Sequence, residues 1–271
     1  MGGIIINWHI RAKFGRIWPD RFSVKRGLVI SDLHLFAHRS EGEGLLSGIE
    51  EMMEAADIVV LNGDIFDFAW SRYRSEEESL GAAQEILQGW VEKFRGEEIS
   101  YVTGNHDCLS SFCVVLDELT EKAGRFRWYR HWCRWGRSLF LHGDCANRRM
   151  DEAALVRQRE KWSENHTRTK VHSALYGVVD GLGLSKGFHR WYFPREKTIS
   201  RVVYHLDATI PNWREVIDDC YFGHTHRPFV DCEVDGVRFH NTGSGIRGMG
   251  FRPIRFEVVE EECPARGLCD V

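Results

Sequence analysis

Residues 28–34 read Leu28-Val29-Ile30-Ser31-Asp32-Leu33-His34, an apolar run that ends in polar side chains. Residues 58–64 (IVVLNGD) and 99–107 (ISYVTGNHD) follow the same plan. Short continuous apolar runs are typical of strands that are buried on both faces. We therefore predict three buried strands. Each is followed by a polar cluster at its carboxyl end, which is where ligands bind in open α/β sheets.

Segments with helical periodicity separate these strands. Apolar residues recur at helical spacing over 45–56, and a second helix is predicted to begin after Ser75, because Glu78 stands three residues later as in a capping box. Alternating strands and helices favour βαβ units. Residues 126–142 and 220–258 instead read as short antiparallel strands. The expected fold class is α/β (α+β), with two mixed sheets packed together and flanked by helices.

The composition excludes several classes of protein. The chain has 271 residues, of which 43% are hydrophobic and 28% charged, with a net charge of -4. These values exclude wholesale disorder and a globally basic nucleic-acid binder, and no dedicated nucleic-acid module is expected. No apolar run approaches the roughly 18 residues that span a bilayer, and no secretory signal is recognised. The eight cysteines form no C-x-x-C pair, so we expect free thiols and a cytoplasmic protein.

Two segments differ from the rest in composition. Residues 1–27 form a basic, aromatic N-terminal segment, and residues 28–271 are expected to form the domain. Within it, about 145–210 is predicted to be a helical insertion or lid, and over 145–201 twelve Lys and Arg stand against six Asp and Glu. Both segments carry Trp and Phe, which favours peripheral contact with the inner face of an anionic membrane. A solvated helical face is the plainer interpretation.

Five polar clusters carry the candidate chemistry. They are Asp32-x-His34, Gly63-Asp64-x-x-Asp67, Gly104-Asn105-His106-Asp107, His142-Gly143 and Gly223-His224-x-His226. Each is predicted to close a strand. Residues i and i+2 of a strand point to the same face, so Asp32 and His34 are expected to aim at one point. Imidazole and carboxylate groups bind Zn, Mn, Fe and similar cations, and Asn oxygen is a weaker ligand.

Each cluster alone is weak evidence, and only their combination is strong. Asp32 alone could be a helix N-cap, and Asn105 a turn residue. Supporting or turn positions, rather than metal ligation, are predicted for Asp67, Asp107 and Asp144. The remaining histidines, His240 among them, are expected on the surface or in the lid.

In this order, the five clusters resemble the calcineurin-like metallophosphoesterase superfamily, over about residues 28–258. The resemblance implies a four-layer αββα sandwich with a two-metal site at the strand ends. Matched position by position, the ligands of one metal would be Asp32, His34 and His226. Those of the other would be Asn105, His142 and His224. Asp64 would bridge the two metals, and His106 would be the catalytic histidine that stabilises and protonates the leaving group.

The resemblance predicts a dinuclear metal-dependent phosphoesterase. Two divalent cations about 3.5–4 Å apart would clamp a phosphoryl group and supply a bridging hydroxide. Mn is the first choice of metal, and Fe, Zn or Co are alternatives that mixed nitrogen and oxygen ligands also admit. The scissile bond would be a phosphomonoester, phosphodiester or pyrophosphate. A non-catalytic scaffold with this fold is one alternative, and a mononuclear hydrolase that leaves Asn105 and His142 idle is another.

The sequence constrains the substrate less. The motifs SDLHL (31–35), GDIFD (63–67), LHGD (141–144) and GHTHRP (223–228) resemble UDP-2,3-diacylglucosamine diphosphatase, a lipid A pathway enzyme with an acyl-binding helical lid. That family has Arg where this chain has His106. A phosphorylated small molecule or another nucleotide-linked substrate is therefore an open alternative, as are dinucleoside polyphosphates, phosphodiesters and phosphoproteins.

Overall fold

The computed structural model of the protein describes residues 22–164 and 192–261. Ten strands in this part of the chain form two five-stranded sheets. The first has the order β10-β1-β2-β3-β4, and its strands are β1 (Phe22–Ile30), β2 (Ile58–Asn62), β3 (Glu98–Val102), β4 (Phe126–Tyr129) and β10 (Ile254–Glu261). The second has the order β5-β6-β7-β9-β8, with β5 (Trp132–Trp135), β6 (Ser138–Leu141), β7 (Asp219–Phe222), β8 (Phe229–Val234) and β9 (Val237–Asn241).

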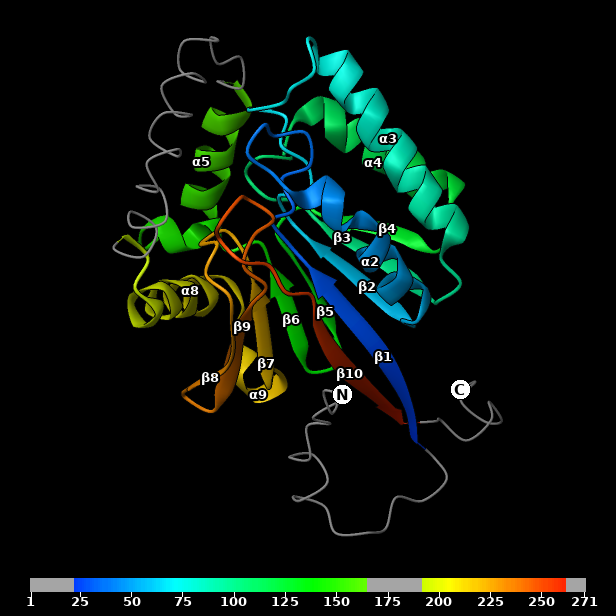
Figure 1. Cartoon of the computed structure of the whole chain (residues 1–271). Helices are drawn as coiled ribbons and strands as arrows, with labels where there is room; N and C mark the ends of the chain where they lie inside the picture. The colour runs from blue at the N-terminus through cyan, green and yellow to red at the C-terminus, as the bar shows by residue number, and fades with distance from the viewer. Residues whose placement is uncertain (1–21, 165–191, 262–271) are drawn as a thin grey trace, which may run out of the picture.

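Helices cover the outer face of each sheet (Figure 1). The first sheet packs against α2 (Gly42–Glu54), α3 (Glu76–Lys93) and α4 (Ser110–Lys122). The second packs against the 3-10 helix η1 (Asp144–Asn147), α5 (Glu152–Glu164), α8 (Arg195–Thr209) and α9 (Trp213–Val216). Between the two sheets lies a third apolar cluster that includes Val29, Val60, Phe140, Tyr221 and Phe256. The expected four-layer αββα sandwich of two mixed sheets is confirmed.

The helix that was expected after Ser75 begins as the capping pattern indicates. Ser75 is the N-cap of α3, and its hydroxyl accepts a hydrogen bond of 3.1 Å from the backbone N–H of Glu78. The Glu78 carboxylate reaches back to the backbone N–H of Arg74, one residue before the cap. The start of α3 is therefore stabilised by side chains that the sequence places within one turn.

The expectation of antiparallel strands in the second half of the chain is only partly confirmed. Strand β4 lies parallel to β3 in the first sheet, and β6, β7 and β9 are parallel to one another. The pairs β5–β6 and β8–β9, each closed by a short turn, are antiparallel, and β10 is antiparallel to β1. Parallel neighbours need a crossover of a dozen or more residues. The helical stretch between β6 and β7 supplies it.

A buried amide joins the two sheets. Asn62 ends β2, and its side-chain Nδ2 donates hydrogen bonds to the carbonyl oxygens of Leu141 in β6, at 2.9 Å, and of Tyr221 in β7, at 3.2 Å. Asn62 is 1% exposed. Since an amide cannot leave these acceptors without cost in a dry interior, the carboxyl ends of β2, β6 and β7 are held at a common level.

The stretch that was expected to be a lid is helical where it is described. Ile199, Val202 and Leu206 of α8 share one apolar core with the second sheet, so α8 is part of the outer helical layer. The remainder, 165–191, lies outside the described residues, as do residues 1–21 of the basic aromatic segment. Strand β1 already begins at Phe22 and pairs with β10. Within 22–164 and 192–261, no helix has the length and apolar character to cross a membrane.

Asp219, at the start of β7, binds side chains of the neighbouring strand β9. Its carboxylate accepts hydrogen bonds from Arg238 at 2.8 and 2.6 Å and from His240 Nε2 at 2.9 Å. His240 is therefore a buried partner, not the surface or lid histidine that was expected. Burial acts to raise the pKa of Asp219, but the hydrogen bonds from His240 and Arg238 hold it below the usual value.

We predict that Asp219→Asn lowers the free energy of unfolding at pH 7 by about 1–2 kcal/mol, because the charged hydrogen bonds are lost. The stabilisation is present above the unfolded-state pKa of about 3.9 and is lost as the pH falls through the lower folded-state value. In urea titrations, the difference between wild type and variant should therefore shrink below about pH 4. Asp218→Asn is the control, since Asp218 pairs with Arg137 at the surface. A difference that is independent of pH would contradict this account.

Candidate metal centre

All eight predicted site residues lie in loops at the carboxyl ends of parallel strands. Because β1, β2 and β3 of one sheet and β6 and β7 of the other end at the same edge, their loops converge (Figure 1). The residues that these loops bring together are Asp32 and His34 after β1, Asp64 after β2, Asn105 and His106 after β3, His142 after β6, and His224 and His226 after β7. Two of the four layers thus contribute to one site.

The side chains converge for a different reason from the one expected. Strand β1 ends at Ile30 and β7 at Phe222, so Asp32, His34, His224 and His226 are not strand residues whose side chains alternate. Their backbones are left-handed, with φ between 49° and 63°, and so is that of Asp64 at 52°. Such conformations cost about 1–3 kcal/mol each in non-glycine residues and persist only where the surroundings impose them. The chain turns at each of these residues, which directs their side chains into one space.

The loops hold one another in this conformation through backbone hydrogen bonds. Asp32 N–H donates to the carbonyl of Gly63 at 2.9 Å, and His34 N–H donates to that of Asp64 at 2.9 Å. The ladder between β1 and β2 thus continues past the strand ends. On the other side, the Asp32 carboxylate accepts the backbone N–H of His224 at 2.8 and 3.0 Å.

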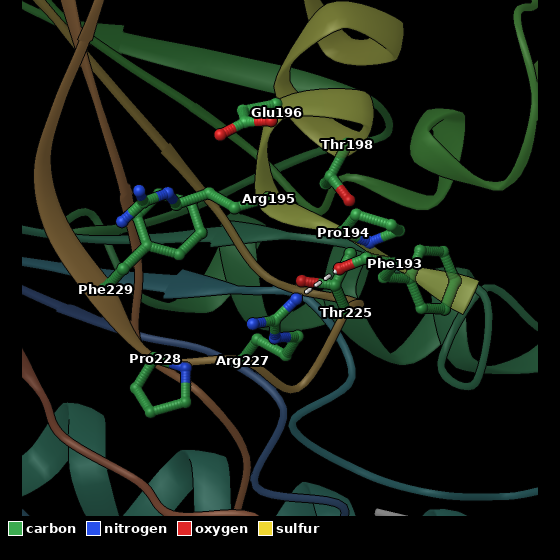
Figure 2. Close-up of a pocket in the computed structure, with 9 residues that line it drawn as sticks. All are labelled: Phe193, Pro194, Arg195, Glu196, Thr198, Thr225, Arg227, Pro228 and Phe229. Atoms are coloured by element: carbon green, nitrogen blue, oxygen red, sulfur yellow. Dashed lines mark hydrogen bonds between the residues drawn. The ribbon is translucent and has the colours of Figure 1, made fainter. Parts of the chain in front are cut away.

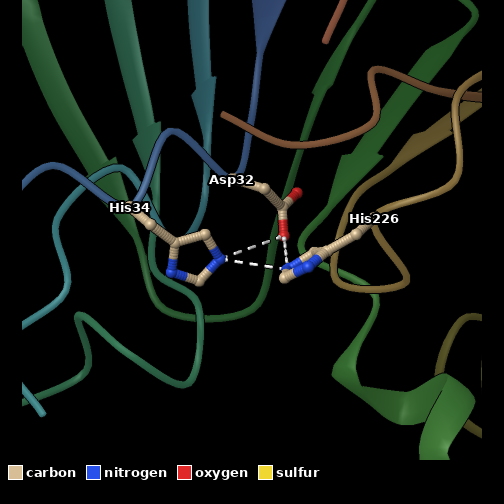
Figure 3. A group of neighbouring side chains, drawn as sticks. All are labelled: Asp32, His34 and His226. Atoms are coloured by element: carbon tan, nitrogen blue, oxygen red, sulfur yellow. Dashed lines mark hydrogen bonds and ion pairs between the residues drawn. The ribbon is translucent and has the colours of Figure 1, made fainter. Parts of the chain in front are cut away.

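The first group of potential ligands is Asp32, His34 and His226 (Figure 3). The Nε2 atoms of the two histidines are 3.0 Å apart, and His226 Nε2 is 3.4 Å from Asp32 Oδ1. Two ligands that are each about 2.1 Å from an ion, at an angle of about 90–110°, are about 3.0–3.4 Å apart. Two of the three spacings therefore suit one divalent cation as they stand, and the third, 3.9 Å between His34 Nε2 and Asp32 Oδ1, is slightly wider. Asp32 and His34 are almost fully buried.

The second group adjoins the first through Asp64. His142 Nε2 is 3.2 Å from Asp64 Oδ2 and 3.3 Å from Asn105 Oδ1, and His224 also lies within reach of Asp64 and His142. The same Oδ2 of Asp64 is 3.8 Å from His34 Nε2 in the first group. One carboxylate thus faces both groups, which is the arrangement that two neighbouring cations require.

Three histidines have the second ring nitrogen held by an acceptor. His34 Nδ1 is 3.2 Å from Asp67 Oδ2, and His142 Nδ1 is 3.4 Å from the carbonyl oxygen of Asn62. His224 Nε2 is 2.9 Å from the amide oxygen of Asn147. A ring that donates through one nitrogen keeps a lone pair on the other, and metal-binding histidines are normally oriented in this way. The donor set therefore fits metal ions.

Asp67 contacts two histidines at once. Its Oδ1 is 3.0 Å from His106 Nδ1, while its Oδ2 contacts His34. His106 is the more accessible of the two, with 14% of its side chain exposed, and its ring lies 5.0 Å from that of Trp162. The position of Asp67 matches the supporting position expected from the sequence. Asp67 orients one candidate ligand and the candidate catalytic histidine together.

The carboxylates strongly favour positive charge in this space. Burial acts to lower the pKa of His142, but Asp64 and Asp32 raise it to about 10. Burial likewise acts to lower the pKa of His106, but the carboxylates of Asp67 and Asp64 raise it to about 9. For His224, burial and the charge of His142 lower the pKa to about 3. Divalent cations can supply the same positive charge, and their binding to these imidazoles releases protons.

Two glycines are required by how closely the backbone approaches the carboxylates. A Cβ atom on Gly223 would lie 2.0 Å from Asp32 Oδ2, and one on Gly104 would lie 2.2 Å from Asp64 Oδ1. Both distances are far below van der Waals contact. Only glycine at these positions lets the β3 and β7 loops reach the carboxylates that follow β1 and β2.

The residues that support the site from behind were not predicted from the sequence. Ser31 Oγ bonds to Asp32 and to Thr242 Oγ1, each at 2.6 Å, and Asn241 Nδ2 donates to the carbonyl of Gly223 at 2.9 Å. Asn241 and Thr242 follow the predicted strand at 237–239. A polar pair after a strand is the signal that could have indicated these two residues. Asn147 had no such signal, because it lies in the 3-10 helix η1.

Helix α5 is fixed over the site by a buried ion pair. Arg159 donates to both oxygens of Asp144 at 2.8 Å, and its other nitrogen bonds to the backbone carbonyl of Arg130. One turn further along α5, Trp162 contacts His106. Asp107 holds the β3 loop in a similar way, since its carboxylate accepts the N–H of Gly104 at 2.6 Å and of Ile65 at 2.9 Å. Both carboxylates thus support the site, as expected.

Residues 26–228 match the family model described as calcineurin-like phosphoesterase. The chain belongs to this family. It is therefore a hydrolase that acts on phosphoester bonds, in a family that depends on two metal ions. No curated protein matches the chain in sequence.

Solved structures that are similar to this phosphoesterase differ widely from it in sequence. Phosphopantetheinyl hydrolase (PptH) from Mycobacterium tuberculosis is 13% identical, with 81% of this chain and 89% of that one covered and a TM-score of 0.43. The phosphoesterase Yfce from E. coli is 13% identical, with 82% of each chain covered and a TM-score of 0.33. A dimetal phosphatase from Danio rerio is 13% identical, with 82% and 88% covered and a TM-score of 0.40.

We predict that Gly223→Ala lowers the metal content of the purified phosphoesterase, because the new methyl group would displace the Asp32 carboxylate. Metal per chain after reconstitution, measured by atomic emission, should fall by at least half. Gly48→Ala is the matched control, since a Cβ atom there meets nothing within 4 Å. Full metal content in Gly223→Ala would show that the close approach does not matter for binding.

Proposed function

We propose that this chain is a dinuclear metal-dependent phosphoesterase with seven ligand residues. One ion would be held by Asp32, His34 and His226, the other by Asn105, His142 and His224, and Asp64 would bridge them. The observation that carries the proposal is the orientation of the histidines. In His34, His142 and His224, one ring nitrogen contacts an acceptor, which leaves the other for a metal. When bound, two divalent cations would neutralise the phosphoryl oxygens and activate the attacking water.

The residues of the chain would position the substrate and move a proton. Asp67 accepts from His106 Nδ1, so Nε2 is the ring atom that can donate to the leaving-group oxygen. The ring of Trp162 lies 5.0 Å from this imidazole, and that of Phe193 lies 5.7 Å from the ring of His224. Apolar walls of this kind limit the access of water and strengthen the electrostatic interactions inside.

Metal reconstitution tests the function directly. We expect metal-stripped protein to bind two Mn²⁺ per chain and then to hydrolyse bis-p-nitrophenyl phosphate, with chelator removing the activity. Asp64→Asn should lower both metal content and turnover, because the shared carboxylate oxygen is lost. One ion per chain in an active enzyme would favour the mononuclear mechanism instead. A chain that binds metals but hydrolyses no phosphoester of any kind would contradict the proposal. Parallel loading with Fe²⁺, Zn²⁺ and Co²⁺ identifies the preferred metal.

His106→Ala should retain two metals and lower kcat by about 10²–10⁴-fold, as expected for the loss of a general acid. The loss should be larger for an alkyl phosphate than for a p-nitrophenyl ester, because the poorer leaving group depends more on protonation. His38→Ala is the control, since His38 is an exposed histidine outside the cluster. Equal losses with both leaving groups would remove the proposed proton transfer from His106.

A UDP-linked acyl-glucosamine is the narrower candidate substrate. Arg195 and Arg227 line a cavity beside the metal centre and suit a molecule with two phosphates. His106 in place of that family's Arg weighs against it. Turnover of this lipid in the assay above would support the candidate, and turnover of the generic diester alone would remove it. Contact with an anionic membrane stays a prediction, because much of the basic aromatic sequence lies outside the described residues. Flotation with anionic vesicles tests it.

A further inference from the structure

A cavity of about 440 Å³ lies beside the metal centre, between the first turn of α8 and the loop that follows β7 (Figure 2). Its polar lining comes from Arg195, Thr198, Thr225 and Arg227, and Glu196 is the one acidic side chain in the lining. Phe193, Pro228 and Phe229 form apolar walls. The volume falls within the range of small-molecule sites. None of the seven proposed metal ligands lines it.

The buried hydroxyl of Thr198 is the feature that points to a ligand. Thr198 is 1% exposed, and its Oγ1 is buried without a hydrogen-bond partner. Figure 2 shows this side chain extending from the first turn of α8 toward Pro194 and Phe193, which also line the cavity. A buried hydroxyl that makes no hydrogen bond is destabilising, and a ligand oxygen in the cavity would satisfy it.

The other polar groups offer donors. Thr225 Oγ1 accepts from Asn241 Nδ2 at 3.2 Å, so its own proton is available to donate. The N-cap of α8 is Pro194, which makes no side-chain hydrogen bond, and the backbone N–H groups of the first turn therefore lack a side-chain cap. Arg227 is held by the carbonyl of Phe193 at 2.7 Å and keeps four further N–H donors. Such a set of donors suits an oxyanion.

The charge of the lining favours the same ligand. Arg195 forms no ion pair within the described part of the chain, and two guanidinium groups stand against the single carboxylate of Glu196. The planar guanidinium matches the geometry of phosphate and carboxylate oxygens. The apolar walls provide room for the carbon skeleton that links such a group to the rest of a molecule.

The cavity and the metal centre share one loop. Thr225 lies between His224 and His226, and Arg227 follows directly. The ring of Phe193, which lines the cavity, also packs against the ring of His224 at 5.7 Å. When the phosphoester of a substrate lies at the metal centre, the part of the molecule next to that ester would therefore reach the cavity.

We propose that this cavity is a subsite for a second acidic group, a phosphate, on the substrate whose phosphoester is hydrolysed at the metal centre. The inference rests on the proposed function and narrows it. The substrate class is a molecule with two phosphate groups, one of which is recognised in the cavity and not cleaved there. Thr198 and the α8 N-terminus bind its oxygens, and Arg195 and Arg227 balance its charge.

The binding test is calorimetric titration of the Zn-loaded full chain with inorganic phosphate. We expect two phosphates per chain, one of which is lost with chelator and one retained. Thr198→Val and Arg195→Gln should weaken the retained class about fivefold or more. Thr209→Val and Lys197→Gln are the matched controls, since Thr209 lies at the far end of α8 and Lys197 does not line the cavity. A single class that disappears with chelator would overturn the subsite.

The kinetic test compares two substrates that differ by one phosphate: the p-nitrophenyl esters of thymidine 5′-phosphate and of thymidine 3′,5′-bisphosphate. We expect the wild-type enzyme to favour the bisphosphate in kcat/KM by about tenfold. Thr198→Val should lower this ratio about fivefold, and Thr209→Val should leave it unchanged. The same ratio in wild type and Thr198→Val would overturn the assignment to substrate, even if phosphate binds. If no phosphoester is hydrolysed at all, the proposed function fails, and the retained phosphate class still reports on the cavity.

Discussion

The hydrogen bonds of the Asn62 side chain are the constraint on which the site depends. They join the end of β2 in one sheet to the ends of β6 and β7 in the other. The loops that carry Asp64, His142 and His224 begin within two residues of these contacts. The cluster between the two sheets is largely apolar, and apolar side chains pack without directional preference, so directional hydrogen bonds such as those of Asn62 set how the sheet ends align. A dinuclear centre needs such alignment, since its ligands come from both sheets.

Negative charge concentrated in a dry interior is the second constraint. Asp32, Asp64, Asp67, Asp107 and Asp144 are each at most 1% exposed. Buried carboxylates are tolerated when they are paired and hydrogen-bonded. Here backbone N–H groups, imidazoles and the Arg159 guanidinium supply those partners. The same carboxylates raise the pKa of His142 and of His106. Burying these carboxylates lowers the stability of the fold, and the same concentrated negative charge favours the binding of cations.

Backbone conformation links these electrostatics to the sequence motifs. Five of the seven proposed ligands have left-handed backbones. Gly104 and Gly223 allow neighbouring loops to pass against the carboxylates without a clash. The motifs Gly-Asn-His-Asp and Gly-His-x-His therefore combine a ligand with the glycine that makes its approach feasible. Each glycine makes room for a carboxylate on another loop. The reason for the glycine is therefore not visible in the strand that precedes it.

The amino-acid sequence by itself determined the three central strands of the first sheet, two of the helices that cover it, the four-layer class and the set of residues that converge. Hydrophobic periodicity is a local property, and a joint set of strand-end motifs is too improbable to arise by chance. Only the tertiary structure decided the parallel order of β6, β7 and β9, the second contacts of His224 with Asn147 and of His240 with Asp219, and the cavity beside Thr198. Each of these joins residues far apart in the chain, so their geometry depends on how the sheets and α8 pack and not on any local pattern.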